Sequence, residues 1–251
     1  MENTANLEML PEEVLKEIYL LEDQAKRLEM REQAQERFMP YAHHVYDNFI
    51  EGTHHRVIAE KLEKIANGEL KRLIVNMPPR HSKSEFASYL MPSWFLGRNP
   101  KLKIIQATMN TELAVRFGRK VRDLIADPKY REVFPDTDLK PDSQAAGRWE
   151  TSAGGEYFAA GVGAAMTGRG ADLLIIDDPH SEQDALSSTA YDNAYEWYTS
   201  GPRQRLQPGG TIIIVQTRWS KKDITGRLLA AQAKDVMADQ WEVVEFPAIL
   251  P

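Results

Sequence analysis

Strand-like and helix-like segments alternate along the chain from Lys71 onward, and no other feature of the sequence restricts the possible folds as strongly. Short apolar runs rich in β-branched residues predict strands at 72–76, 103–108, 156–160, 173–177, 211–216 and 241–246. Patterns of helical period predict helices at 84–95, 111–126, 182–200 and 222–233. This alternation predicts an α/β fold with a mainly parallel central sheet flanked by helices on both faces, which binds ligands at the carboxyl ends of its strands.

A candidate phosphate-binding loop lies where the first predicted strand meets the first predicted helix. Residues 73–84 read L-I-V-N-M-P-P-R-H-S-K-S, so an apolar run ends in a stiff turn that delivers Lys83 and Ser84 to a helix start. Free N–H groups at a helix start bind anions, and Lys83 is placed to reach the β and γ phosphates of a nucleotide. Ser84 is expected to bind Mg²⁺. Arg80 adds a cation for the γ phosphate or for a carboxylate. The segment therefore predicts a P-loop.

The loop departs from an ordinary P-loop, because both usual glycines are missing. Met77 holds the first glycine position and Ser82 the second. Glycine is usual there because the chain turns through positive φ while its amides face the phosphates. Pro78 and Pro79 each lack a backbone donor, so free amides are expected only at 81–84.

An acidic pair, Asp177-Asp178, ends the apolar run at 173–177. Nucleotide-hydrolysing sites combine a cationic phosphate loop with acidic groups at a strand end. We expect Asp177 to hold Mg²⁺, directly or through water, and Asp178 to orient and polarise the attacking water. The loop and the pair together, in this order and spacing, favour an ATPase.

Two further segments add groups to the expected site. A glycine-rich loop at 161–170 carries Arg169, which could enter a nucleotide site in cis or across a subunit boundary and stabilise charge on the transferred phosphoryl group. The run at 211–216 ends in Q-T-R-W, where Thr217 could sense the γ phosphate. The expected catalytic residues are Asp178, Arg80, Arg169 and Lys83, and the expected metal ligands are Ser84 and Asp177. The expected nucleotide contacts are Pro79, Arg80, His81, Ser82, Lys83, Ser84, Glu85 and Thr217.

Each motif also has a purely structural interpretation. The loop could be a Pro-rich turn with a helix N-cap at Ser82, and the acidic pair an Asp-Asp-Pro capping turn. Arg169 could be solvated on a flexible loop, and Q-T-R-W could cap a strand. The histidine pairs at 43–44 and 54–55 lack acidic or thiolate partners at ligand spacing, so we interpret them as structural rather than metal-binding.

Composition excludes several classes of protein. The 251 residues are 42% hydrophobic, which suffices for one large core. No apolar run approaches 18 residues, and the polar start is unlike a secretory signal. The absence of cysteine excludes disulfides and thiolate–metal sites and fits a reducing compartment. A net charge of −6 argues against a uniformly basic coat for nucleic acid, but not against a local basic stripe.

Residues 1–37, rich in Glu, Gln, Lys and Leu, predict a helical N-terminal appendage outside the main core, and 38–251 the main domain. Leu10, Val14, Ile18 and Leu21 lie at helical spacing, which suits a solvated appendage, a lid or a subunit contact. Basic side chains that could contact DNA phosphates on one helix face, or lie on a mixed solvated surface, are Arg116, Arg119, Lys120 and Arg122. Further candidates are Arg203, Arg205, Lys221 and Lys222.

From Phe38 onward, these motifs resemble the N-terminal packaging ATPase domain of the large terminase subunit of tailed bacteriophages. The family's N-x-P-P-R-H-x-K-S-E loop matches 76–85, its T-G-x-G-A-D-x-x-I-I-D-D-P pattern matches 167–179, and its Q-T-R-W segment begins at 216. Most relatives have Gly where Ser82 stands. The resemblance implies an ASCE-type P-loop fold, with Arg169 as a trans-acting finger and Thr217 in a coupling motif. The stretch F-x-P-Y-x-H-H at 38–44 looks like the family's adenine-side region.

The resemblance also implies a function and partners. We expect a Mg²⁺-dependent ATPase that translocates double-stranded DNA into a procapsid, with the portal protein and a small terminase subunit as partners. Such domains act as a homo-oligomeric ring on the portal, in the host cytoplasm and without a membrane; an isolated domain could be monomeric. The family's nuclease domain would follow residue 251, so no nuclease activity is expected. Two alternatives stay open: a helicase-like P-loop ATPase acting on DNA, and a non-hydrolysing nucleotide-binding subunit.

Overall fold

A single sheet of eight strands forms the centre of the computed structural model, which describes residues 10–247. The strands are β1 (Arg72–Asn76), β2 (Lys103–Thr108), β3 (Leu139–Ala145), β4 (Arg148–Thr151), β5 (Glu156–Gly161), β6 (Ala171–Asp177), β7 (Leu206–Gln216) and β8 (Glu242–Glu245). Their order is β3-β4-β5-β2-β6-β7-β1-β8, antiparallel from β3 to β5 and parallel from β5 to β8. The predicted α/β fold with a mainly parallel sheet is confirmed.

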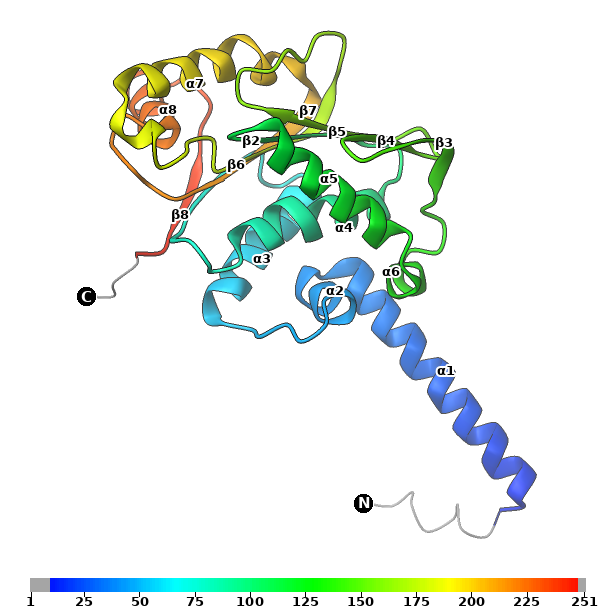
Figure 1. Cartoon of the computed structure of the whole chain (residues 1–251). Helices are drawn as coiled ribbons and strands as arrows, with labels where there is room; N and C mark the ends of the chain where they lie inside the picture. The colour runs from blue at the N-terminus through cyan, green and yellow to red at the C-terminus, as the bar shows by residue number, and fades with distance from the viewer. Residues whose placement is uncertain (1–9, 248–251) are drawn as a thin grey trace.

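Helices cover both faces of this sheet (Figure 1). They are α1 (Glu12–Glu36), α2 (Phe38–Val45), α3 (Thr53–Ala66), α4 (Met91–Arg98), α5 (Thr111–Ile125), α6 (Pro128–Val133), α7 (Ser188–Ser200) and α8 (Ile224–Lys234), with a π-helical turn at Glu85–Leu90 and 3-10 turns at Asp184–Leu186 and Pro202–Arg205. None of the helices described between residues 10 and 247 combines the length and apolar character needed to cross a membrane.

Alternation along the strands separates two hydrophobic cores. Leu73 and Val75 of β1 face the core under α2 to α6, whereas Ile74 between them faces the core under α7 and α8. Successive side chains of a strand point to opposite faces, so a strand that is apolar throughout has to be covered on both. Figure 1 shows α7 and α8 on one side of the sheet and α3 to α6 on the other.

The predicted strands agree with the structure better than the predicted helices. The strands expected at 72–76 and 103–108 have these bounds, β7 begins earlier than expected, and β8 is shorter. The helix expected from 182 begins at Ser188, because the Ser187 hydroxyl accepts the Ala190 N–H and caps it. Helices α2, α3 and α6 and the antiparallel pair β3 and β4 were not predicted. The pair β3 and β4 was missed because β3 is polar and largely exposed at a sheet edge, so it lacks apolar alternation.

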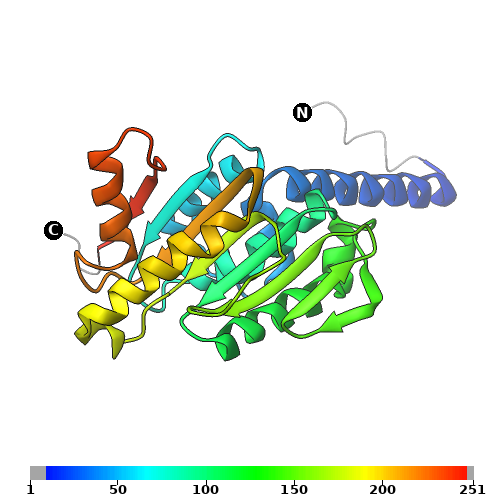
Figure 2. The same cartoon turned by 90° about the horizontal axis from the view of Figure 1, so that it is seen from above.

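The N-terminal segment forms one long helix, α1, that projects from the body of the protein (Figure 2). Its C-terminal end belongs to the main core rather than to a separate appendage. Ala34 is fully buried, and its carbonyl accepts the indole N–H of Trp94 at 2.9 Å. Gln35 donates to the carbonyl of Val133 at 2.6 Å. The segment expected outside the core at 1–37 therefore enters it at its last turn, and residues 1–9 and 248–251 lie outside the described residues.

Trp94 should contribute more to stability than other single side chains of this region. It is fully buried, its ring lies edge-on to Phe38 with centroids 5.4 Å apart, and its N–H anchors α1. We expect Trp94→Ala to lower the unfolding free energy by about 3 to 5 kcal/mol, measured by urea denaturation. Trp94→Phe, which keeps an aromatic ring but removes the donor, should cost about 1 to 2 kcal/mol. Equal losses in both variants would contradict a dominant packing role.

Candidate functional site

The carboxyl ends of three strands bring the sequence-predicted residues to one edge of the sheet. Strand β7 lies between β1 and β6, with Asn76 opposite Gln216 and Asp177 opposite Val215. The loop after β1 and the acidic pair after β6 therefore flank the end of β7, where Thr217 follows. The site is built around β7, a strand that the sequence does not place between the other two.

The loop after β1 turns at the second of the two expected glycine positions, Ser82, but not at the first, Met77. The N–H of Met77 donates to the Gln216 carbonyl at 3.0 Å, so this residue continues the β1–β7 pairing instead of turning. Positive φ occurs at Arg80 (65°) and Ser82 (64°). The Phe86 N–H donates to the Ser82 carbonyl at 3.0 Å, and the π-helical turn Glu85–Leu90 follows at once. Ser82 thus adopts the left-handed conformation for which glycine is favoured.

Replacing Ser82 by glycine should stabilise the protein. A non-glycine residue in the left-handed region costs about 1 to 2 kcal/mol, and the extra flexibility of glycine returns only part of this gain. We expect Ser82→Gly to raise the unfolding free energy by roughly 1 kcal/mol in urea denaturation. Ser82→Ala keeps the Cβ atom and should bring no gain, so an equal rise in both variants would show that the hydroxyl, not the backbone, is responsible.

Lys83 and Asp178 form an ion pair at the centre of the site. The Lys83 ammonium is buried and lies 2.7 Å from Oδ2 of Asp178. The other Asp178 oxygen accepts the Thr217 N–H at 2.8 Å, and Asp178 itself has a φ of 42°. The Asp178 carboxylate is therefore held from two strand ends, while Lys83 is placed so that a phosphate would compete with Asp178 for it.

Asp177 is buried beneath this pair. Its carboxylate accepts hydrogen bonds from two serine hydroxyls on the segment that follows Lys83. Ser84 Oγ donates to Oδ1 at 3.0 Å, and Ser88 Oγ donates to Oδ2 at 2.7 Å. Burial, and then the nearby charge of Asp178, raises the pKa of Asp177 to about 7. Ser88 also accepts a hydrogen bond from Gln106 at 2.9 Å. Sequence reasoning missed Ser88 and Gln106; the four-residue spacing of Ser84 and Ser88 was the available signal.

Ser84 and Asp177 have the donor chemistry that Mg²⁺ requires. Their side chains supply hydroxyl and carboxylate oxygens 3.0 Å apart, and Mg²⁺ in nucleotide sites usually takes one or two protein oxygens together with phosphates and water. Among residues 10–247, no group of three or more His, Asp or Glu side chains could hold a metal ion by itself. The residues fit a metal that arrives with a phosphate ligand.

A cavity of about 430 Å³ opens beside the ion pair, a size common for small-molecule sites. Its wall combines the loop after β1, the acidic end of β6 and apolar side chains. It is lined by Pro79, Lys83, Met109, Leu113, Asp178, His180, Ser181, Glu182, Gln183, Thr217 and Trp219. Met109 and Trp219 are 39% and 40% exposed, so apolar surface is available to a ligand here. Sequence reasoning did not assign His180, Met109 or Leu113 to the site.

Two residues of the Q-T-R-W segment, Thr217 and Trp219, line this cavity, whereas the other two are part of supporting networks. Gln216 donates to Thr225 at 2.7 Å, and Arg218 pairs with the fully buried Asp223 at 2.8 Å. The Thr217 hydroxyl lies 3.4 Å from the Met77 carbonyl. The segment therefore links the loop after β1 to the start of α8.

The two arginines proposed as catalytic lie in different places. Arg80 is exposed on the loop and forms no ion pair with residues 10–247. Arg169 pairs with Glu156 and its guanidinium lies 3.9 Å from the centroid of the Phe158 ring. Glu156 begins β5, so Arg169 lies at the amino edge of the parallel strands, opposite the site. Arg169 therefore does not join the site of its own chain, and a neighbouring subunit would have to present it.

Two other groupings expected from the sequence are dispersed by the fold. Lys120 binds both carboxylate oxygens of Glu85, and Arg122 pairs with Asp123, which leaves Arg116 and Arg119 as the exposed members of the expected basic face.

The expected adenine-side aromatic rings are inaccessible, because Phe38 and Tyr41 are fully buried. We correct that assignment: both rings are core side chains.

The histidine pairs expected to be structural have protein partners. His43 pairs with Glu51, and His44 with Glu132. The rings of His54 and His55 lie 3.9 Å apart, and His55 stacks on Phe86. Burial lowers the pKa of His55 to about 4, so it is neutral at physiological pH.

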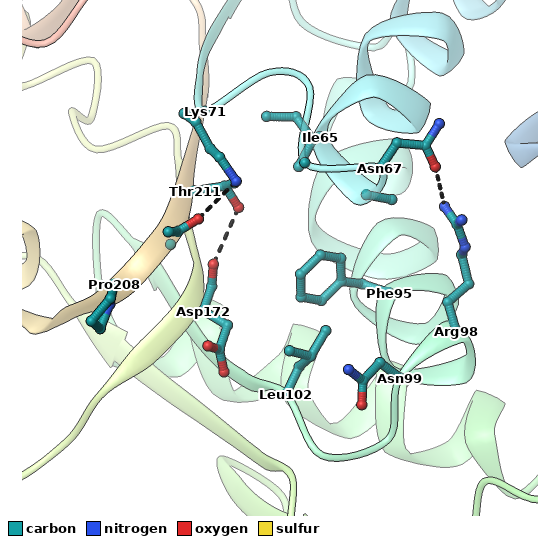
Figure 3. Close-up of a pocket in the computed structure, with 14 residues that line it drawn as sticks. Ile65, Asn67, Lys71, Phe95, Arg98, Asn99, Leu102, Asp172, Pro208 and Thr211 are labelled. Carbon is teal, nitrogen blue, oxygen red and sulfur yellow. Dashed lines mark hydrogen bonds between the residues drawn. The ribbon is translucent and has the colours of Figure 1, made fainter.

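A further cavity, of about 350 Å³, lies at the amino edge of the sheet (Figure 3). Its polar groups already have partners within the protein: Lys71 donates to the Gly209 carbonyl, Arg98 to Asn67, and Thr211 to the Asp172 carbonyl. The C-terminal ends of α3 and α4 contribute to its wall. Such ends disfavour anions, so this cavity is not a candidate for a phosphate ligand.

No protein-family model and no curated protein sequence matches this chain. Among solved structures, the crystal structure of the HK97 bacteriophage large terminase is similar, with a TM-score of 0.46 and 13% sequence identity. The match covers 74% of this chain and 38% of that one. A likeness this weak carries no functional argument, so the function is inferred from the site itself.

Proposed function

We propose that this chain is a Mg²⁺-dependent ATP hydrolase with an ASCE-type P-loop fold. One observation carries the proposal: the buried Lys83 of a tight loop pairs at 2.7 Å with Asp178, next to a second carboxylate, Asp177, that is bonded to Ser84. A cation, a hydroxyl and two acids from separate strand ends are the parts that phosphoryl transfer needs. The adjoining cavity of about 430 Å³ supports it by offering room for a nucleotide.

The ion pair suggests how ATP would activate its own hydrolysis. The β and γ phosphates would attract Lys83 away from Asp178, which frees one carboxylate oxygen while the Thr217 N–H still holds the other. Asp178 would then accept a proton from water as the water oxygen attacks the γ phosphorus and the bond to the bridging oxygen breaks. The products are ADP and phosphate. Bound Mg²⁺, held by Ser84 and Asp177, would neutralise charge on the phosphates.

Further groups have supporting roles in this proposal. Amide groups at 81–84 would face the phosphates, with Glu85 fixed by Lys120 behind them. Arg80, exposed on the loop, would approach the γ phosphate, and Arg169 of a neighbouring chain would complete the site. Thr217 touches the loop at Met77, and its neighbours Gln216 and Arg218 contact the start of α8, so this segment would transmit the change that follows hydrolysis.

The resemblance of the motifs to terminase large subunits suggests what hydrolysis drives. We propose translocation of double-stranded DNA into a procapsid by a homo-oligomeric ring on the portal, with a small terminase subunit selecting the DNA in the host cytoplasm. Arg116 and Arg119, the exposed pair on α5, are the first candidates for DNA phosphate contacts.

The test is Mg-ATP turnover as a function of protein concentration, with and without duplex DNA. If the protein works as a ring, turnover per chain should rise steeply with protein concentration. Turnover should also recover in part when the Arg169→Ala and Asp178→Asn variants are mixed. In such a mixture some interfaces combine the intact Asp178 of one chain with the intact Arg169 of its neighbour. Flat turnover without recovery would remove Arg169 from the site, and duplex unwinding would favour the helicase-like alternative. Binding of ATP without turnover would support a non-hydrolysing subunit and defeat the proposal.

A further inference from the structure

Helix α1 carries an apolar stripe that the rest of the described chain leaves largely exposed. Its members follow one another at alternating spacings of four and three residues, so they align along one side of the helix: Val14, Ile18, Leu21, Ala25 and Leu28. Leu21 and Leu28 are each 57% exposed. A continuous apolar line on a projecting helix indicates a contact surface.

The stripe lies on the side of α1 that faces away from the body of the protein. The helix is anchored in its last turn by Ala34, which is fully buried. Ala25 precedes Ala34 by about two and a half helical turns, so their side chains point in opposite directions. Figures 1 and 2 show the preceding turns projecting from the body. A second helix therefore has access to the stripe without displacing the body.

Two charges of opposite sign, Glu17 and Arg31, flank the stripe on the same side. Neither forms an ion pair with residues 10–247, and neither has an opposite charge three or four residues away in its own helix. By contrast, Lys16 and Arg27 pair with acids of their own helix at 2.6 and 2.8 Å. Charges that flank an apolar seam set partner choice and orientation, so Glu17 and Arg31 are the ones to match.

Arg31 opens onto a hollow of about 330 Å³ between α1 and α6, which Arg27 and Leu28 also line. The acidic side chain on the wall of this hollow is Glu132, and it already pairs with His44 at 3.1 Å. The α1 side of the hollow therefore presents two cations. A carboxylate arriving from another chain would be complementary to them.

An antiparallel second copy of α1 supplies that carboxylate. When two identical helices pair antiparallel, the same flank of each helix meets, so Glu17 of each copy faces Arg31 of the other. The same register sets Leu21 of each copy against Ala25 of the other at the centre of the stripe, large against small. We propose that α1 docks a second copy of itself in this antiparallel register.

The opposite flank carries one unfavourable contact, because Glu22 meets its own copy at the two-fold axis. This single repulsion stands against two Glu17–Arg31 attractions. A parallel pair is less favourable, since Glu17 would face Glu22 at two places. Arg31 would then be balanced only by Glu36, where α1 has already entered the core. The charges therefore select the antiparallel pair.

This contact is separate from the ring contacts of the proposed motor. It is isologous and closes on itself as a dimer, whereas a ring is built from heterologous contacts. The two bodies would stand at opposite ends of the helix pair, because each is attached to the C-terminal end of its own α1. The inference therefore does not rest on the proposed nucleotide site.

Charge reversal and its rescue test the register. Sedimentation equilibrium of the intact protein over a range of concentrations measures dimer affinity. We expect Glu17→Arg or Arg31→Glu alone to weaken dimerisation about 10-fold or more, because each places like charges at both contacts. The double variant restores opposite charges and should recover affinity to within about 3-fold of the unchanged protein. Salt should weaken the unchanged dimer.

Leu21 and Leu20 provide a matched pair of variants for the apolar seam, since both are 57% exposed but Leu20 lies off the stripe. Leu21→Ser should weaken dimerisation about 10-fold or more, and Leu20→Ser should leave it within about 2-fold. Unchanged helical content by circular dichroism would exclude loss of α1 itself.

Several outcomes would overturn the proposal. A protein that stays monomeric up to about 0.1 mM has no such contact. A tighter dimer in Glu17→Arg would indicate parallel pairing, and failure of the double variant to recover would remove the Glu17–Arg31 contact. Equal effects of Leu21→Ser and Leu20→Ser would place the dimer contact elsewhere. None of these readouts depends on ATP turnover.

Discussion

Asp178→Asn should reduce ATP turnover by about 10³-fold while leaving ATP binding intact. The amide cannot accept the proton of the attacking water, a role commonly worth 10² to 10⁴ in rate. Lys83 would lose its 2.7 Å ion pair with Asp178 and become free for phosphate, so affinity should be kept or improved. Single-turnover hydrolysis and equilibrium binding of a fluorescent ATP analogue measure the two effects separately.

Glu182→Gln is the matched control for this substitution. Glu182 lines the same cavity, but it is exposed and forms no ion pair with the described residues, so its replacement should change turnover less than about 2-fold. If Asp178→Asn hydrolysed ATP at the normal rate, Asp178 would be a positioning group for Lys83, and the general base would have to be sought elsewhere in the cavity.

Lys83→Ala should weaken ATP binding by about 100-fold and bring turnover to background. In the proposed site the buried Lys83 ammonium would contact the β and γ phosphates, and one hydrogen bond to a charged group contributes roughly 1.5 to 3 kcal/mol. ADP, which lacks the γ phosphate, should lose less affinity than ATP. Isothermal titration calorimetry with both nucleotides would measure the difference.

Two controls separate this loss from a simple structural effect. Lys221→Ala removes an exposed lysine near the same strand end and should leave ATP affinity unchanged. Lys83→Ala combined with Asp178→Asn removes both members of the pair, so no carboxylate is left without its partner. If the double variant bound ATP normally, the single variant would have failed because of the uncompensated Asp178 charge, and Lys83 would not be a phosphate ligand.

The convergence of Lys83, Ser84, Asp177 and Asp178 was predictable from the sequence. Apolar runs marked β1 and β6 as buried parallel strands, and the carboxyl ends of such strands share one edge of the sheet. The strong apolar signal of β1, β2 and β6 comes from burial on both faces, which is why their bounds were close to those expected.

Other parts of the site depended on contacts between segments far apart in the chain. The hydrogen bond from Ser88 to Asp177 joins residues 89 positions apart, and the Thr217 N–H reaches an Asp178 carboxylate 39 positions away. Arg169 was expected to enter the nucleotide site from the glycine-rich loop, in cis or across a subunit boundary, but it pairs with Glu156 at the amino edge of the sheet. That ion pair depends on β5 and β6 lying in one sheet, which local spacing does not specify.

By itself, the sequence determined the class of fold, the turn after β1 and the acidic end of β6, because periodicity, proline and charge act over a few neighbouring residues. The tertiary structure alone decided that β7 separates β1 from β6, and that Phe38 and Tyr41 are core rings. It also decided that Ser82 holds the left-handed turn without glycine. The reason is physical: strand order, burial and backbone strain are settled by packing of the whole chain, whose free energy is shared among residues distant in sequence.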